Sequence, residues 1–152
     1  MKHIPITTIA AVLLAGCTNS TSQDQSIEKN QIIDKQGSFI FKPKGDHKAI
    51  RVWYYKPPSY NALTPVVFVM HGMKRNGESY LKSWIPLARE GDFFLIVPEF
   101  STNAYPHSSG YNQGNMYSRN GNKRNEAYWS FTVIENLFDY ITTSTKSKVE
   151  NY

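Results

Sequence analysis

Two unbroken apolar runs limit the folds that are open to this chain. They are Pro65–Met70 (Pro-Val-Val-Phe-Val-Met) and Phe93–Pro98 (Phe-Phe-Leu-Ile-Val-Pro). A strand with one wet face alternates apolar and polar residues, so a continuous run indicates a strand covered on both faces, as in a parallel sheet beneath helices. Residues 78–90, between the runs, carry apolar side chains at helical spacing and are followed by Gly91, a typical helix stop. The order of strand, helix and strand predicts a βαβ unit.

The segment before this unit has the pattern of an antiparallel hairpin. Ser38–Phe41 and Ile50–Tyr55 are rich in β-branched and aromatic residues, which favour strands. Lys44-Gly45-Asp46 between them is typical of a turn. We therefore expect the two strands to pair with each other before the chain enters the βαβ unit.

The helices expected on either side of the second apolar run are less regular than the strands. Pro86 lies inside the first helix, and its missing N–H predicts a kink or a split there. Residues 101–125 form a long polar loop, and loops of this length are usually functional or disordered. An amphipathic helix is expected over 125–142. Its apolar stripe consists of Tyr128, Phe131, Ile134, Phe138 and Ile141.

The N-terminus has the layout of an exported protein. A short basic start leads into the apolar run Ile4–Leu14, which ends in Leu14-Ala15-Gly16-Cys17. The run is too short to span a bilayer, which takes about 20 residues, and small residues before a cleavage point are typical of a signal peptide. The tetrad resembles the lipobox of bacterial lipoproteins, in which the cysteine is lipidated. The expected divisions are a signal peptide over 1–16, the lipidated Cys17 and a flexible polar tether over 17–36, and one domain over 37–152.

The resemblance to lipoproteins implies a location and excludes some partners. It implies a lipid-anchored protein of the bacterial cell envelope, and Thr18 after the cysteine resembles lipoproteins sorted to the outer membrane, facing the periplasm or the surface. Without residues 1–16 the chain has 16 Lys and Arg against 12 Asp and Glu, and these basic residues are scattered. Together with export, this scatter argues against a nucleic-acid partner. Cys17 is the only cysteine, so no disulfide is expected.

The domain resembles the beginning of an α/β-hydrolase. Val66–Gly72 is similar to the third strand of that fold running into its His-Gly turn, and Tyr111–Asn115 followed by Trp129 resembles secreted esterases of the polyhydroxyalkanoate-depolymerase type. The similarity extends over residues 48–152 and corresponds to the N-terminal half of a full-length member. It implies an α/β fold class, a partial α/β-hydrolase fold, with an ester substrate for the complete family member and no cofactor.

The catalytic motif of that family is not found in these 152 residues. The family uses a serine in Gly-x-Ser-x-Gly at a strand-to-helix elbow, followed in the chain by an acid and then a histidine. The nearest match is Pro106–Gly110, but its Ser108 follows loop residues rather than an apolar strand, so we interpret it as an ordinary loop serine. Residues 149–152 stand where the elbow strand should begin. We therefore expect no catalytic residue here and a chain truncated before the nucleophile, acid and base.

Of the family's catalytic groups, the resemblance assigns only half of an oxyanion hole to these residues. One donor of such a hole is a backbone N–H in the turn after the third strand, and the matching positions are Gly72 and Met73, with the Met73 N–H favoured. His71 is interpreted as a structural histidine of the turn rather than a general base. His47 and His107 have no partner at metal-ligand spacing, so no metal site is expected.

Two functions remain open from the sequence. The first is a membrane-tethered serine esterase lineage, represented here by a part that is inactive alone. The second is a non-catalytic lipoprotein that binds a partner through the aromatic-rich loop over 101–130. In either case the missing continuation would leave the strand over 65–70 with an open edge, and an exposed edge favours self-association.

Overall fold

The computed structural model describes residue 32 and residues 35–152 of the chain. The elements in chain order are β1 (Gln36–Phe41), β2 (Ile50–Tyr55), β3 (Val66–Phe68), α1 (Gly77–Glu90), β4 (Phe94–Glu99), the 3-10 helix η1 (Glu126–Tyr128) and α2 (Ser130–Thr145). The predicted signal peptide over 1–16, the lipid on Cys17 and most of the tether over 17–36 lie outside the described residues. The described end of the tether differs from the expectation, because Ile32 is buried in the core and β1 already begins at Gln36.

The strands form one mixed sheet in the order β1-β2-β4-β3. β1 and β2 are antiparallel neighbours, with Phe39 opposite Val52, which confirms the predicted hairpin. β3 and β4 are parallel, with Val67 opposite Leu95, and α1 connects them, which confirms the predicted βαβ unit. β2 and β4 pair antiparallel and so join the hairpin to the βαβ unit in a single sheet.

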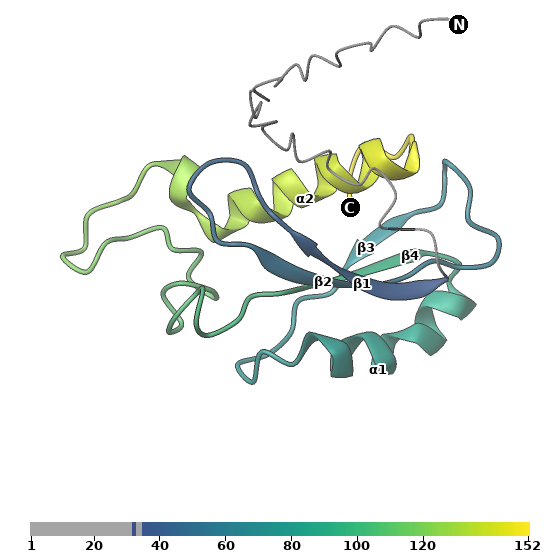
Figure 1. Cartoon of the computed structure of the whole chain (residues 1–152), viewed down its shortest axis with the longest axis horizontal. Coiled ribbons are helices and arrows are strands. Elements are labelled where there is room, and N and C mark those ends of the chain that lie inside the picture. The colour runs from purple at the N-terminus through teal and green to yellow at the C-terminus, as the bar shows by residue number, and fades with distance from the viewer. Residues whose placement is uncertain (1–31, 33–34) are drawn as a thin grey trace, which may run out of the picture.

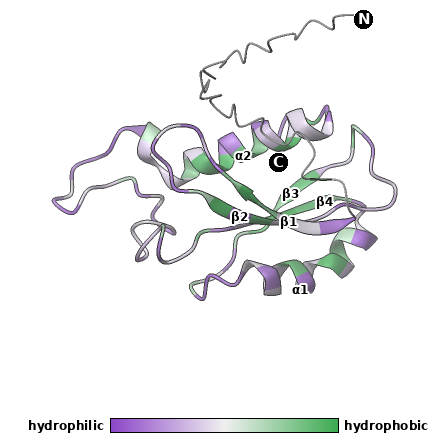
Figure 2. Cartoon of the chain, viewed as in Figure 1, coloured by the Kyte–Doolittle hydropathy of each residue, from purple (hydrophilic) through white to green (hydrophobic). Residues whose placement is uncertain are grey.

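β4 is covered on both faces, which explains why its apolar run is unbroken. Its side chains alternate between two cores: Phe94 and Ile96 belong to the core that contains α2, whereas Leu95 and Val97 belong to the core that contains α1. All four are completely buried. Figure 1 shows the two helices on opposite faces of the sheet, and Figure 2 shows hydrophobic residues concentrated in the strands between them. Each such side chain stabilises the fold by about 1.5–3 kcal/mol relative to an exposed one.

Pro86 does not split α1, contrary to one of the two outcomes expected from the sequence. The helix continues to Glu90, and the Gly91 N–H donates to the Leu87 carbonyl at 2.8 Å. The proline removes one hydrogen bond, the one to the carbonyl of Lys82. Because Lys82 and Pro86 are both exposed, that carbonyl lies on the side of the helix that water can reach. Gly91 ends the helix, as predicted.

α2 begins five residues later than predicted, and this changes which residues are buried. Trp129 is extended, with φ −74° and ψ 140°, and separates η1 from α2. Tyr128 therefore does not lie on the helix, and both it and Phe131 are about half exposed, so these two members of the predicted stripe were wrong. The buried face of α2 consists of Ser130, Val133, Ile134, Leu137 and Ile141. No helix in the described part of the chain is long and apolar enough to cross a membrane.

β3 lies at an edge of the sheet, because β4 is its only neighbour among the described strands. With the span Val66–Phe68 it is shorter than predicted. Residues 149–152, where we expected a further strand to begin, have no regular structure. Instead, the Tyr152 ring packs with its centroid 4.8 Å from that of Phe68. The tail therefore covers part of the edge that was expected to be open.

Candidate functional site

The His71 ring connects the ends of the two parallel strands. His71 follows β3, and only 3% of it is exposed. Its Nε2 accepts the N–H of Phe100, the residue after β4, at 2.9 Å, so the ring proton must be on Nδ1. Nδ1 then donates to the Gly72 carbonyl at 2.9 Å. Burial lowers the pKa of His71, which keeps the ring neutral. With both nitrogens engaged by the backbone, His71 has the structural role that the sequence suggested.

Tyr111 fastens the long loop to this turn. Its hydroxyl donates to the His71 carbonyl at 2.6 Å, and its ring lies 4.6 Å from the His71 ring. Burial raises the pKa of Tyr111 to about 12, so the hydroxyl keeps the proton that it donates at neutral pH. The Tyr111–Asn115 motif therefore places an aromatic side chain directly on the His-Gly turn.

Arg75 also packs against the Tyr111 ring. Its guanidinium carbon lies 4.2 Å from the centroid of Tyr111. Nη1 donates to the Phe100 carbonyl at 2.7 Å, and Nη2 donates to the His107 carbonyl at 3.0 Å. Arg75 has the left-handed φ of 56°, which costs about 1–2 kcal/mol for a residue with a Cβ. Arg75 was not predicted from the sequence, because its acceptors lie 25 and 32 residues further along the chain.

Gly72 and Met73 form an open backbone corner in this framework. The Arg75 N–H donates to the Gly72 carbonyl at 3.0 Å and closes the turn. A Cβ on Gly72 would lie 2.9 Å from the Tyr80 hydroxyl, so only glycine fits without displacing that side chain. Met73 is 58% exposed, and its N–H donates to no other group in the described part of the chain. A backbone N–H held in this way can donate a hydrogen bond to a bound oxygen atom.

Glu99 holds the start of α1 below the turn. Its Oε2 accepts both the Trp53 indole N–H and the Gly77 N–H, each at 2.9 Å. The carboxylate thus satisfies one of the free N–H groups at the helix N-terminus, where negative charge is favourable. A Cβ on Gly77 would lie 2.9 Å from this oxygen. Sequence reasoning missed this contact, because β2, β4 and α1 meet there only in the folded sheet.

Ser108 is not at a nucleophile elbow. It lies exposed in a turn, and its carbonyl accepts the N–H groups of Tyr111 and Gln113 at 3.1 and 3.0 Å. No strand runs into it, and within the described residues its hydroxyl has no hydrogen bond to a histidine. The interpretation of Ser108 as a loop serine agrees with this geometry.

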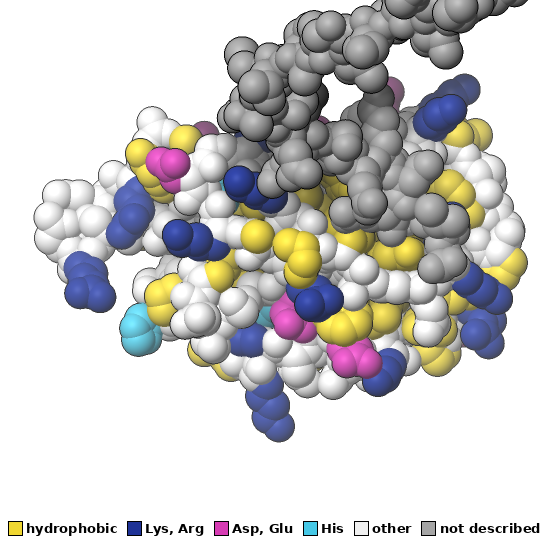
Figure 3. All heavy atoms as spheres, viewed as in Figure 1, with side chains coloured by type: hydrophobic (Ala, Val, Ile, Leu, Met, Phe, Trp, Pro, Cys, Tyr) yellow, Lys and Arg dark blue, Asp and Glu magenta, His cyan; other side chains and the backbone are white. Residues whose placement is uncertain are grey.

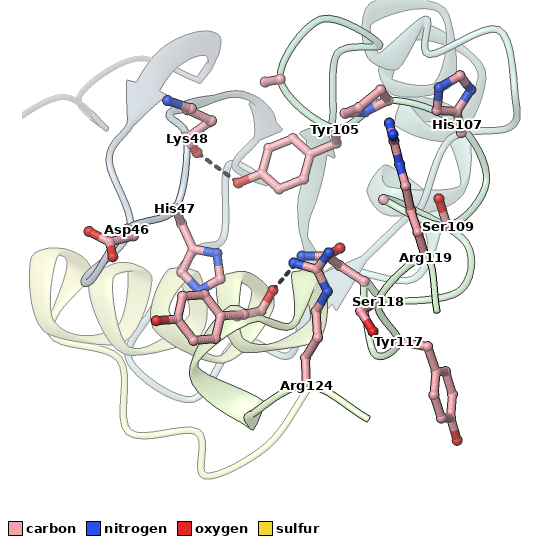
Figure 4. A pocket seen from close by; sticks show the side chains of 15 residues that line it. Asp46, His47, Lys48, Tyr105, His107, Ser109, Tyr117, Ser118, Arg119 and Arg124 are labelled. Carbon is pink, nitrogen blue, oxygen red and sulfur yellow. Dashed lines mark hydrogen bonds between the residues drawn. The ribbon is translucent and has the colours of Figure 1, made fainter. Parts of the chain in front are cut away.

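A hollow of about 510 Å³ opens where three loop segments meet. Its walls come from the β1–β2 turn at 46–48, from 104–110 and from 115–128. Figure 4 shows Arg119 and Arg124 reaching into this space and the His47 ring on its opposite side. The length and composition of the loop over 101–125 marked it in the sequence, but no local signal linked it to the β1–β2 turn. Among the described residues, no three His, Cys, Asp or Glu side chains are grouped to hold a metal ion.

Comparisons with known proteins add to this geometry. No protein-family model matches the chain, and no curated protein sequence matches it. A solved structure of poly(aspartic acid) hydrolase-1 from Sphingomonas sp. KT-1 is 39% identical, with a TM-score of 0.72 over 77% of this chain and 44% of that one. The LpqC poly(3-hydroxybutyrate) depolymerase from Bordetella parapertussis is 27% identical, with a TM-score of 0.67 over 74% of this chain and 39% of that one.

These similarities bear on fold and ancestry. The fold class is α/β, a partial α/β-hydrolase fold with an antiparallel hairpin, a parallel βαβ unit and a further helix, as predicted. The two neighbours support a hydrolase-like ancestry. The chain spans less than half the length of either neighbour.

Proposed function

We propose that this chain is the N-terminal part of an α/β-hydrolase that cleaves ester or amide bonds in polymers, and that it supplies one donor of the oxyanion hole. The observation that carries this proposal is the turn at Gly72 and Met73. Its exposed Met73 N–H has no acceptor among the described residues, while His71, Tyr111 and Arg75 hold the backbone around it. A preorganised N–H of this kind stabilises the charge that develops on a carbonyl oxygen when it is attacked.

The rest of the chemistry comes from residues outside these 152. Hydrolysis by this fold needs a serine at an elbow, an acid and a histidine, as well as the second N–H donor, which follows the serine. Losing one donor of an oxyanion hole costs about 3–4 kcal/mol of transition-state stabilisation. Because the sequence contains no Gly-x-Ser-x-Gly, the 152-residue chain alone is inactive in this proposal.

The substrate class follows from what the two neighbours act on. One is named for poly(aspartic acid) and the other for poly(3-hydroxybutyrate), so one polymer is linked by amides and the other by esters. Attack on either carbonyl gives a tetrahedral oxyanion, and the same backbone donor serves both. Carboxylic-ester hydrolysis by a complete enzyme remains the activity that the sequence resemblance favours.

The cell envelope is the proposed location. The support is the short apolar run ending in Leu-Ala-Gly-Cys, with Cys17 as the lipid attachment site. More than one acyl chain is needed for stable anchoring, and the lipobox resemblance implies several. We place the anchored protein at the outer membrane, facing the periplasm or the surface.

A chimera tests the hydrolase proposal. Residues 36–152 replace the matching segment of poly(aspartic acid) hydrolase-1, and the proposal requires the remaining chain of that protein to supply the triad. Hydrolysis by the chimera is expected, and Met73→Pro, which removes the N–H, should lower kcat about 10²- to 10³-fold. Met73→Ala is the matched control, since it keeps the N–H and should retain the rate. A folded chimera that is inactive, or a Met73→Pro chimera that is as fast as Met73→Ala, would contradict the proposal.

A second candidate is a lipoprotein that binds without catalysis through the loop over 101–130. The hollow beside Arg119 and Arg124 favours this candidate, because it is built within the described chain and uses no catalytic residue. An inactive chimera together with a polymer ligand for the hollow would select this function over the first.

A further inference from the structure

The hollow lies at the same end of the sheet as the His-Gly turn. Its loop leaves β4 after Glu99, and the next residue, Phe100, donates its N–H to His71. The β1–β2 turn reaches this end as well, since Arg51 near the start of β2 pairs with Glu99. In open α/β sheets, ligands bind outside the carboxyl ends of the parallel strands. The hollow and the Met73 N–H are therefore on the side where substrates of such folds are held.

Positive charge dominates the lining. Lys48, Arg119 and Arg124 line the hollow together with two histidines, whereas Asp46 is its only acidic residue. None of the three cations forms an ion pair with a described residue. The one ion pair among the described residues joins Glu78 and Lys82 on α1. Figure 3 shows Lys and Arg side chains spread over the visible face, several of them on the loop at the left of the view. The hollow thus presents cations that the described chain leaves uncompensated.

The walls of the hollow are fixed by hydrogen bonds. The Tyr105 hydroxyl donates to the Lys48 carbonyl at 2.7 Å, which ties the long loop to the β1–β2 turn. The Asn115 side-chain amide donates to the Tyr128 carbonyl at 2.8 Å and joins the two ends of the far wall; Figure 4 draws both bonds. In contrast, Nε2 of His47 is a buried ring nitrogen without a hydrogen-bond partner in the described chain. A buried polar atom of this kind needs a hydrogen-bond partner, and a polar group bound in the hollow can supply one.

We propose that this hollow binds a polymer whose side groups are carboxylates, and that it selects such chains for the hydrolytic site. A guanidinium is planar and pairs with a carboxylate through two parallel hydrogen bonds, so two arginines on one wall suit successive carboxylates. The exposed rings of Tyr117 and Tyr128 on the lining offer apolar faces to the polymer backbone. The role in selection rests on the proposed function, whereas the binding itself does not.

Binding without turnover tests this inference. The full 152-residue chain in a neutral detergent is titrated with fluorescent poly-L-aspartate while the anisotropy is recorded. The double variant Arg119→Gln, Arg124→Gln is expected to weaken binding about tenfold or more. The control is the double variant Lys82→Gln, Arg89→Gln on α1. It also removes two positive charges, but from exposed positions outside the hollow, and should bind as the parent does. Raising the salt concentration should weaken binding in the parent more than in the pocket variant.

Three results would overturn the inference. The first is an equal loss of affinity in the control, which would show an effect of net charge alone. The second is equally tight, arginine-dependent binding of inorganic polyphosphate, which would show a general anion site. The third is binding of neutral poly-L-asparagine that the variants leave unchanged. Circular dichroism checks the fold of each variant, and Lys48→Gln repeats the test if the double variant is unfolded. If the chain does not bind poly-L-aspartate but the chimera is active, only the binding role of the hollow is rejected. If the chain binds poly-L-aspartate but the chimera is inactive, only the hydrolase proposal is rejected.

Discussion

The N–H of Phe100 donates to Nε2 of His71 at 2.9 Å, so a side chain after β3 is locked to the backbone after β4. The other ring nitrogen donates to the Gly72 carbonyl, which makes the imidazole a bridge between the two strand ends. A neutral ring with one donor and one acceptor is the form that satisfies both partners at once. The shape of the turn at Met73 therefore depends on the protonation state of His71.

The first prediction concerns this bridge. His71→Phe keeps an aromatic ring but removes both hydrogen bonds, leaving the Phe100 N–H and the Gly72 carbonyl without their ring partner. An unsatisfied buried polar group costs about 1–3 kcal/mol, so we expect the variant to lose about 2–4 kcal/mol of unfolding free energy. Urea unfolding followed by circular dichroism measures this change. A loss below about 0.5 kcal/mol, the scale of an ordinary surface substitution, would show that the bridge is unimportant.

The second prediction is the pH dependence of the same residue. The pKa of His71 is lowered in the folded chain, mainly by burial, so below its ordinary pKa of 6.5 the unfolded chain binds a proton that the folded chain does not. The stability that His71 contributes is therefore complete above that pH and declines as the pH falls toward the folded pKa. We expect the gap in unfolding free energy between the parent and His71→Phe to narrow from pH 7.5 to pH 5. A gap that widens over this range would contradict the neutral bridge.

Local patterns of the sequence were enough to predict the strands and the βαβ unit. The run at 93–98 predicted a doubly covered strand, and β4 has side chains in both cores because each face carries a helix. The break at Trp129 was not predicted, because the periodicity fitted a continuous helix just as well. As a result Phe131 was expected on the buried stripe, whereas it is about half exposed.

The candidate site was less predictable than the fold. The position of the turn at Gly72 followed from a short motif, but the contacts that hold it come from Phe100, Tyr111 and Arg75, and those form only when β3 and β4 are side by side. The hollow combines the β1–β2 turn with a loop that starts more than 50 residues later, as the contact between Lys48 and Tyr105 shows. No sequence window contains such a pair.

The third prediction is that Cys17 anchors the protein. Cys17→Ser removes the thiol that the lipobox resemblance assigns to the lipid. The variant should either appear in the soluble fraction or accumulate with its signal peptide uncleaved, and fractionation with an immunoblot distinguishes these forms from the parent. Ser20→Ala, a change in the same polar segment, is the control. Normal processing and full membrane retention of the cysteine variant would exclude lipidation at this site.

The fourth prediction is that the chain by itself does not hydrolyse esters. Ser108 lies in a turn, and no histidine in the described part of the chain is bonded to it; no other serine has an elbow sequence around it. Purified chain should release p-nitrophenol from short p-nitrophenyl esters no faster than heat-denatured chain does. Turnover that disappears in Ser108→Ala and persists in Ser109→Ala would identify Ser108 as a nucleophile after all.

The fifth prediction concerns the edge of the sheet at β3. This strand has one neighbour in the described chain, and Met70 and Phe131 beside it are about half exposed, although Tyr152 covers Phe68. An unpaired strand edge next to apolar side chains is a template for pairing with another copy. We therefore expect the isolated chain to dimerise or aggregate at micromolar concentration, as sedimentation velocity would show.

Two substitutions near β3 make the prediction specific. Tyr152→Ala should strengthen association, because it uncovers the Phe68 ring that the tail packs against at 4.8 Å. Phe131→Lys should weaken association, since it places a charge beside the edge, and a charge opposes strand pairing there. Phe131 is 47% exposed, so this change removes little of the core. A parent chain that sediments as a monomer and unfolds in one cooperative thermal transition would show that the loops and the tail already close this edge. In that case the described residues form a finished domain, and the binding function through the hollow gains support over the hydrolase fragment.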